Sequence, residues 1–247
     1  MIEIKERFYT QRLFARELSR YDLFWPVCYY SYRGDPGTIP WYYKIVRGSS
    51  AVSDLTMDME QQLALMKSNT RNEIKRAIKE GCSFEIGQDY QSFIPYYNAF
   101  SKSKGLNDYV NMKRLTKYKG DNIVFVTKAL HGETVLSMHA TVVNLREKIA
   151  YLILSCSHRL DANADKKLIG WGNRYLHYKD LEAFKAMGVE VYDWSGVCTA
   201  PDDPRYSIGV FKLSFGGKIV SSLVLSSPLF LLLEWLRSIV LRMKLKK

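Results

Sequence analysis

Three apolar, β-branched segments with very short polar connections constrain the fold of this chain more than any other feature. The segments span residues 123–130, 134–145 and 148–157, and residues 131–133 and 146–147 connect them. Connections this short join antiparallel neighbours, because a parallel pair needs a crossover of about a dozen residues or more. We therefore predict a three-stranded antiparallel meander at the centre of a sheet.

A long helix and a further strand are expected after the meander. Residues 161–187 carry apolar side chains at helical spacing, with Asn163 or Asp165 available as N-cap and Gly188 available to end the helix. Residues 188–194 then alternate in a period of two, which is typical of a strand. The order of strand, helix and strand predicts a mixed α+β domain.

The rest of the chain is punctuated by turn and capping residues that delimit further elements. The expected elements are a surface helix at 1–20, a hairpin of strands 23–32 and 41–46 around the turn 34–37, helices at 58–81, 90–104 and 111–119, a helical turn at 206–215, a strand at 218–225 and a helix in the tail from 228. This order predicts three parts, which are an N-terminal extension with a β-hairpin (1–56), the main domain (57–225) and an amphipathic C-terminal helix (226–247).

The chain is strongly basic, with a formal net charge of +11 at pH 7. Such a charge favours anionic partners, and RNA, nucleotide-linked sugars, coenzyme A and anionic lipid head groups are the candidates. Part of the charge recurs every four residues on the helix expected at 58–81, and a basic ridge of this kind can hold phosphates or remain a solvated helix face. The ridge consists of Lys67, Arg71, Lys75 and Lys79, with Arg76 beside it.

Cysteine and histidine spacing argues against disulfide and metal chemistry. Four cysteines are widely separated without a CxxC pair, and four histidines show no ligand spacing, so we expect no metal. The first twenty residues are interrupted by charges and lack the apolar run of a signal peptide. We therefore expect the protein in the cytoplasm.

The stretch at residues 189–217 combines several local signals around one lysine. A strand ends at Asp193-Trp194, and Ser195-Gly196 follows, where backbone can approach a ligand closely. A proline-containing loop at 200–204 interrupts regular structure, and Lys212 precedes the glycine pair 216–217.

Two sequence runs in this chain resemble those of a known family. The runs YDWSGV (192–197) and GVFKLSFGG (209–217) resemble the C-terminal signature of Fem-type peptidoglycan bridge aminoacyltransferases and of BioF2-like single-domain acyltransferases of the GNAT superfamily. The run KSNTRNEIKRAIKEG (67–81) is similar to the basic helix at the start of their acyltransferase domain. The resemblance covers about residues 57–222. It implies a GNAT-like fold in which a mixed, mostly antiparallel sheet is flanked by helices.

The resemblance also implies acyl transfer to an amine and suggests roles for individual residues. It implies that Lys212 stabilises the oxyanion or the leaving group and that Phe211 contacts the acyl end, while Asp193 either orients the lysine, acts as a base or merely caps the following turn. The further candidates for substrate binding are the ridge residues Arg71 and Arg76, Arg159 before the long helix, and Tyr151 and His139 on the central strands. A histidine on a central strand is more often a core residue with a satisfied partner than a catalytic residue.

The donor and acceptor stay open at this level. The donor would be an acyl-CoA or an aminoacyl-tRNA, although the turn at 157–165 lacks the glycines with which GNAT enzymes hold pyrophosphate. The acceptor would be an amine on a nucleotide- or lipid-linked precursor of the cell envelope or a surface polysaccharide. The alternatives are a non-catalytic RNA-binding module and a scaffold held peripherally at the inner membrane surface by its basic, apolar tail.

Overall fold

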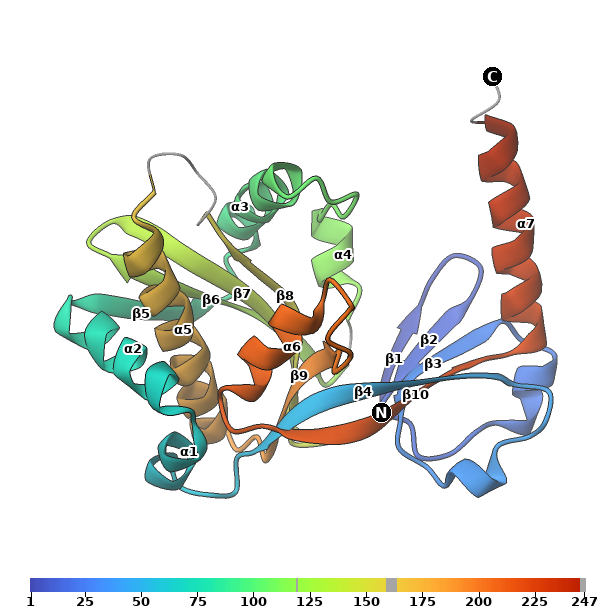
Figure 1. Ribbon diagram of the computed structural model, residues 1–247. Coiled ribbons are helices and arrows are strands. Elements are labelled where there is room, and N and C mark those ends of the chain that lie inside the picture. Colours follow the sequence, from blue (N-terminus) through green and yellow to red (C-terminus); the bar gives the residue numbers. More distant parts are fainter. Residues whose placement is uncertain (119, 159–163, 245–247) are drawn as a thin grey trace. The chain divides into compact units, whose positions relative to one another are not determined.

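The structure is a computed structural model that divides into two compact units (Figure 1). It describes residues 1–118, 120–158 and 164–244. Unit 1 comprises Met1–Ser50 and Val220–Lys247, and unit 2 comprises Ala51–Ile219. Both ends of the chain therefore belong to unit 1, whereas the sequence-based boundaries treat them as separate parts.

The meander predicted from the short connections forms the centre of the sheet in unit 2. Strands β6 (Asn122–His131), β7 (Thr134–Asn144) and β8 (Ile149–Ser157) pair antiparallel in chain order. Strand β9 (Val191–Val197) pairs parallel with β8, and the unpredicted strand β5 (Cys82–Gly87) pairs antiparallel with β6. With helices flanking this sheet, the α+β, GNAT-like fold class is confirmed.

The long helix that follows the meander is α5 (Lys166–Ala186), which packs on β5 to β8 and against α2. Its N-terminus is capped by Asp165, whose Oδ1 accepts from the backbone N–H groups of Lys167 (2.9 Å) and Leu168 (3.0 Å). It ends before Gly188, whose φ of +88° is a conformation that favours glycine. Both ends agree with the prediction.

The single helix expected at residues 58–81 is instead two helices, α1 (Met59–Leu65) and α2 (Ser68–Lys79). Met66 and Lys67 between them are extended, with ψ values of 148° and 145°. The break has a tertiary cause, because Met66 is buried and the backbone N–H of Lys67 donates to Ser214 O at 2.9 Å. Helical periodicity continues across the break, so the sequence pattern did not reveal it.

Three shorter helices lie close to their predicted positions. These are α3 (Tyr90–Ser103), α4 (Met112–Thr116) and α6 (Tyr206–Leu213). Asp89 caps α3 by accepting from Ser92 N at 3.0 Å, and Asn111 caps α4 by accepting from Arg114 N at 3.0 Å. Such caps are local signals, which is why the sequence could place α3 and α4.

An aromatic core in unit 2 joins α5, β9 and the end of α6. Trp194 is fully buried and stacks on Phe215 with ring centroids 4.9 Å apart, while Tyr192 stacks on Phe184 at 6.0 Å. The Trp194 indole also donates to Ser53 Oγ at 2.9 Å, so its polar atom is satisfied. This packing holds β9 on one side of α6 and the residues directly after α6 on the other.

The first part of unit 1 is a strand pair, so the helix predicted at residues 1–20 is wrong. Strand β1 (Ile2–Lys5) pairs antiparallel with β2 (Thr10–Leu13), and a short 3-10 helix, Arg20–Leu23, follows. Ile2 and Ile4 are both buried, which is the period-two pattern of a strand. Four residues are too few for that pattern to stand out against the charges around them.

The hairpin predicted from the turn residues 34–37 is also wrong. Strands β3 (Val27–Tyr32) and β4 (Lys44–Asp54) do form, but β10 (Lys218–Ser226) lies between them in the sheet. In register, β10 pairs antiparallel with β3, and Leu225 faces Tyr29. A segment about two hundred residues away therefore takes the place beside β3, which no local turn signal can indicate.

The tail forms the predicted helix, α7 (Pro228–Lys244), which begins directly after β10 in unit 1. Its first turn is held by Ser227, whose Oγ accepts from Val27 N at 2.9 Å and donates to Trp25 O at 2.8 Å. In the part of the chain that the structure describes, no helix combines the length and the apolarity needed to cross a bilayer.

Candidate active site

A cavity of about 550 Å³ in unit 2 lies where β8 and β9 part. The two strands are paired only from Ile149 opposite Val191 to Tyr151 opposite Asp193, and the cavity begins with the next β8 residue, Leu152. Helices α3, α5 and α6 supply the remaining walls. The lining residues are Phe100, Lys104, Leu152, Ser155, Cys156, Ser157, Lys166, Ile169, Gly170, Asn173, Arg174, His177, Ile208, Phe211 and Lys212.

Lys212 and Phe211 line this cavity from α6, as neighbours on the helix that the aromatic core anchors. The Lys212 ammonium donates to Gly196 O at 2.9 Å. Burial lowers the pKa of Lys212 to about 8, and the negative charge of Asp193 partly opposes that shift. A lysine with this pKa is mostly protonated at pH 7 and releases its proton more readily than an ordinary lysine.

Asp193 is fully buried, and it is not among the described residues that line the cavity. Its Oδ1 accepts from Ser195 N at 2.8 Å, so it makes the capping contact that was the structural alternative for this residue. Ser195 has a φ of +68°, which this contact helps to hold. Asp193 influences the cavity through its negative charge, which partly opposes the lowering of the Lys212 pKa by burial.

Neither Tyr151 nor His139 is among the described residues that line the cavity. Tyr151 is hydrogen-bonded through its hydroxyl to Ser195 Oγ at 3.3 Å, and burial raises its pKa. His139 is fully buried on β7, where its Nδ1 lies 2.6 Å from Asp180 Oδ2 and its Nε2 lies 3.4 Å from Asn173 Oδ1. His139 is therefore a core residue whose ring nitrogens both have hydrogen-bond partners.

Helix α5 supplies cavity-lining residues that the sequence analysis did not single out, among them Asn173, Arg174 and His177. Arg174 is ion-paired with Glu73 at 2.8 Å, and its guanidinium lies 5.1 Å from the centre of the Phe211 ring. Asn173, His177 and Asp180 follow at i, i+4 and i+7, so they share one face of the helix. Polar side chains at these positions, among the apolar residues of the helix face that packs on the sheet, were the available signal.

His177 is buried between the cavity and His139. Its ring lies 4.0 Å from the His139 ring and 5.4 Å from the Phe211 ring, and its Nδ1 has no hydrogen-bond partner among the described residues. Burial lowers the pKa of His177 well below its ordinary value, and the neighbouring His139 and the cations Lys212 and Arg174 add to the shift. His177 is therefore neutral at pH 7.

The ligand atoms of His139, His177 and Asp180 lie within 4.8 Å of one another, a spacing that a metal ion could bridge. Two observations argue against a metal here. His139 Nδ1 and Asp180 Oδ2 are already hydrogen-bonded to each other at 2.6 Å, and the cations Lys212 and Arg174 lie close enough to act on His177. The cluster fits proton transfer better than metal binding.

The candidate phosphate-binding arginines lie outside the lining of this cavity. Arg71 donates to Ala64 O at 3.2 Å and to Met66 O, so it caps the end of α1. Arg76 lies over the Trp171 ring at 5.8 Å. Arg159 lies outside the described residues.

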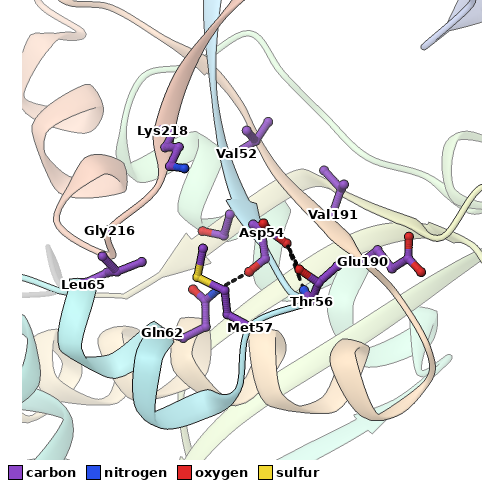
Figure 2. A pocket seen from close by; sticks show the side chains of 11 residues that line it. Val52, Asp54, Thr56, Met57, Gln62, Leu65, Glu190, Val191, Gly216 and Lys218 are labelled. Atoms are coloured by element: carbon purple, nitrogen blue, oxygen red, sulfur yellow. Dashed lines mark hydrogen bonds between the residues drawn. The ribbon is translucent and has the colours of Figure 1, made fainter.

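A second cavity, of about 300 Å³, lies at the end of β4 and the start of α1 (Figure 2). Its polar side chains are engaged locally, since Asp54 accepts from Thr56 Oγ1 at 2.6 Å and Glu190 is ion-paired with Lys148 at 2.5 Å. Lys218 also lines it, as Figure 2 shows. None of the residues implied by the family resemblance lies in it, and we regard the larger cavity as the candidate site.

Comparisons with known proteins bear on the fold. No family model matches the chain, and no curated protein matches its sequence. Among solved structures, FemX superposes with a TM-score of 0.62 at 12% identity, covering 89% of this chain and 82% of FemX. The chain has a Fem-type, GNAT-like fold.

The same fold occurs in two further solved structures. The C-terminal domain of a protein described as a lysylphosphatidylglycerol synthetase from Agrobacterium fabrum gives a TM-score of 0.58 at 13% identity, covering 84% of this chain and 71% of that one. L-PGS from Bacillus licheniformis gives 0.57 at 12% identity, covering 91% and 79%. At such identities the likeness establishes the fold.

Proposed function

We propose that this protein transfers an activated acyl or aminoacyl group to an amine of a cell-envelope or surface-polysaccharide precursor. The observation that carries the proposal is Lys212, a lysine with a pKa of about 8 on the wall of a cavity at the parting of two strands. The Fem-type fold supports it, because FemX and the lysylphosphatidylglycerol synthetases share that fold.

In the proposed reaction, the neutral amine of the acceptor attacks the carbonyl carbon of the donor ester or thioester. A C–N bond forms, and the carbonyl electron pair moves onto oxygen, where the Lys212 ammonium stabilises the charge. The bond from carbon to the donor oxygen or sulfur then breaks, and that atom takes a proton from Lys212. Phe211, beside Lys212 on the cavity wall, would contact the acyl end.

The attacking nitrogen must also lose a proton, and His177 is the proposed acceptor. It lines the cavity and is neutral at pH 7, so its imidazole can take the proton and return it to Lys212. His139 stacks beneath it and is held by Asp180, so both act as positioning residues. The products are an amide and the free alcohol or thiol of the donor.

The charge of the cavity favours substrates that carry phosphate. Its described lining includes the cations Lys104, Lys166, Arg174 and Lys212, and no carboxylate is among those residues. Acyl-CoA and aminoacyl-tRNA as donors, and nucleotide-linked or lipid-linked acceptors, all bring phosphate groups. A lipid-linked acceptor would bring the enzyme to the inner face of the membrane as a peripheral protein, whereas a nucleotide-linked acceptor would be met in the cytoplasm.

The test is mass spectrometry of products after incubation with acyl-CoAs, charged transfer RNAs and amine-bearing sugar nucleotides or aminolipids. We expect an amide product whose rate of formation falls about 10²–10³-fold in Lys212→Met. Lys218→Met is the matched control, because Lys218 lies on the other cavity, and it should keep the wild-type rate.

Absence of product from every donor and acceptor pair would contradict the proposal. Binding of RNA that is unchanged in Lys212→Ala would then favour the non-catalytic RNA-binding alternative. Lys67, Lys75 and Lys79 of the basic ridge are exposed and would be the contacts in that case.

A further inference from the structure

Helix α7 presents an apolar stripe that no described element of unit 1 covers. Leu232, Trp235, Leu236 and Val240 follow the spacing i, i+3, i+4 and i+8, so they lie on one face of the helix. They are exposed by 47%, 59%, 46% and 46%, which is far above the level of core residues. Figure 1 shows α7 (red) continuing past the ends of the unit 1 strands from which it starts.

The helix is held to the rest of unit 1 at its N-terminal end. Phe230 is buried there against Tyr9, with ring centroids 5.1 Å apart, and its backbone N–H donates to Ser227 Oγ at 3.4 Å. Beyond this first turn, the four residues of the stripe are exposed. A stripe of this composition left in water is unfavourable, so it indicates an apolar partner.

The charges on and after α7 indicate what kind of partner that is. Glu234 and Arg237 lie away from the stripe and pair with each other at 3.5 Å. Residues 242–247, RMKLKK, carry four basic side chains and no acidic one. A basic end next to an apolar stripe complements an anionic lipid surface, which offers both negative head groups and an apolar layer.

Further exposed aromatic residues lie at the base of α7 in unit 1. Phe24 and Trp25 are exposed by 73% and 58%, and Trp25 O accepts from Ser227 Oγ directly before the helix. Phe8, exposed by 64%, adjoins Tyr9, which contacts Phe230. Tryptophan and phenylalanine are favoured at the boundary between head groups and acyl chains.

We propose that α7 lies in the surface of an anionic lipid bilayer, with Leu232, Trp235, Leu236 and Val240 directed into the acyl layer. The positive charge that the sequence carries at residues 242–247 adds electrostatic attraction to the acidic head groups. This inference does not depend on the transfer reaction, because its site lies in unit 1 and the candidate active site lies in unit 2. A second copy of the chain, joined through the same stripe, is the competing occupant.

The test is co-sedimentation of the full chain with vesicles of phosphatidylcholine that contain, or lack, about a third of phosphatidylglycerol. We expect binding to the anionic vesicles, weaker binding to pure phosphatidylcholine, and loss of the difference at high salt. Leu236→Glu should weaken binding about tenfold or more, because a large apolar contact is replaced by a charge that the lipid repels.

Ser238→Glu is the matched control, because it adds the same charge to α7 beside the stripe and should weaken binding far less. Leu236 is exposed, so its substitution leaves the core intact. Equal binding of wild type and Leu236→Glu, or no binding to anionic vesicles, would overturn the proposal. A wild-type dimer in solution that Leu236→Glu converts to a monomer would also overturn it and assign the stripe to a second copy.

Discussion

Placing the ammonium group of Lys212 on the wall of a cavity has a cost in free energy. Burial removes water from the charged form, and the pKa of the side chain falls from the ordinary 10.5 to about 8. The contact with Gly196 O and the charge of Asp193 compensate only in part. A buried, charged lysine destabilises the folded protein, and such a cost is typical of residues that a protein needs for its activity.

We therefore expect Lys212→Met to raise the free energy of unfolding at pH 7, by about 1–3 kcal/mol. The folded pKa is lower than the unfolded one, so the unfolded state binds more protons between pH 8 and 10.5, and wild-type stability rises with pH across that window. The advantage of the variant should be complete below pH 8 and lost by pH 10.5.

Urea unfolding of wild type and Lys212→Met at pH 7 and pH 10.5 measures this difference. Lys218→Met serves as the control, because Lys218 is exposed and its replacement should leave the free energy of unfolding nearly unchanged at both values. A Lys212→Met protein that is less stable than wild type at pH 7 would show that the hydrogen bond to Gly196 outweighs the burial of the charge.

Some residues of the candidate site could be predicted from the sequence, and others could not. Lys212 and Phe211 were found through the run GVFKLSFGG, and both line the cavity. His177 was not found, because a single histidine within a helix looks the same whether it faces a cavity or a core. Its role depends on His139, which is 38 positions away in the sequence and 4.0 Å away in the fold.

At the scale of elements, α6 is positioned by a close approach to the chain that follows β9. A Cβ atom at Gly209 would lie 2.3 Å from Cys198 O, so no side chain fits between the helix and that carbonyl. Phe211 and Lys212 follow within the next turn of α6. The position of the whole helix, and hence of the ammonium, depends on this contact.

Gly209→Ala should therefore displace α6, destabilise the fold by about 1–3 kcal/mol and reduce acyl transfer more than tenfold. Thermal unfolding and the transfer assay measure the two effects. Ser207→Ala is the control, because Ser207 is exposed on the same helix and alanine is a good helix former. Unchanged transfer in Gly209→Ala would mean that α6 tolerates the shift and that its position is not critical.

Element prediction succeeded where local signals were sufficient. The meander, α3, α5 and α7 follow from periodicity, short connections and caps within each segment. It failed at the start of the chain, where four-residue strands are stabilised by pairing with their neighbours, and at Met66 and Lys67, where a contact with Ser214 interrupts a helical pattern.

At the scale of the whole molecule, the chain passes from unit 1 to unit 2 within β4 and returns within β10. The cavity belongs to unit 2, and α7 belongs to unit 1. Chemistry and surface contact are thus assigned to different units of the chain. They should be separable by truncation.

A chain that ends at Leu231 keeps the buried contact of Phe230 with Tyr9 but lacks the apolar stripe. We expect it to fold, to transfer an acyl group to a water-soluble acceptor at the full-length rate, and to lose binding to anionic vesicles. Circular dichroism, the transfer assay and co-sedimentation measure these three properties. Loss of transfer to the soluble acceptor in a folded truncated chain would show that α7 contributes to the reaction itself.

The amino-acid sequence by itself determined the central meander, the long helix after it, the α+β class and the candidate lysine. These features follow from periodicity, caps and a short motif, all of which act between neighbours in the chain. Only the tertiary structure decided that β10 separates β3 from β4, that β8 and β9 part at a cavity, and that His177 faces it. The reason is physical, because strand order and cavity walls arise from contacts between distant segments, and local sequence patterns carry no information about which distant segment will pack against them.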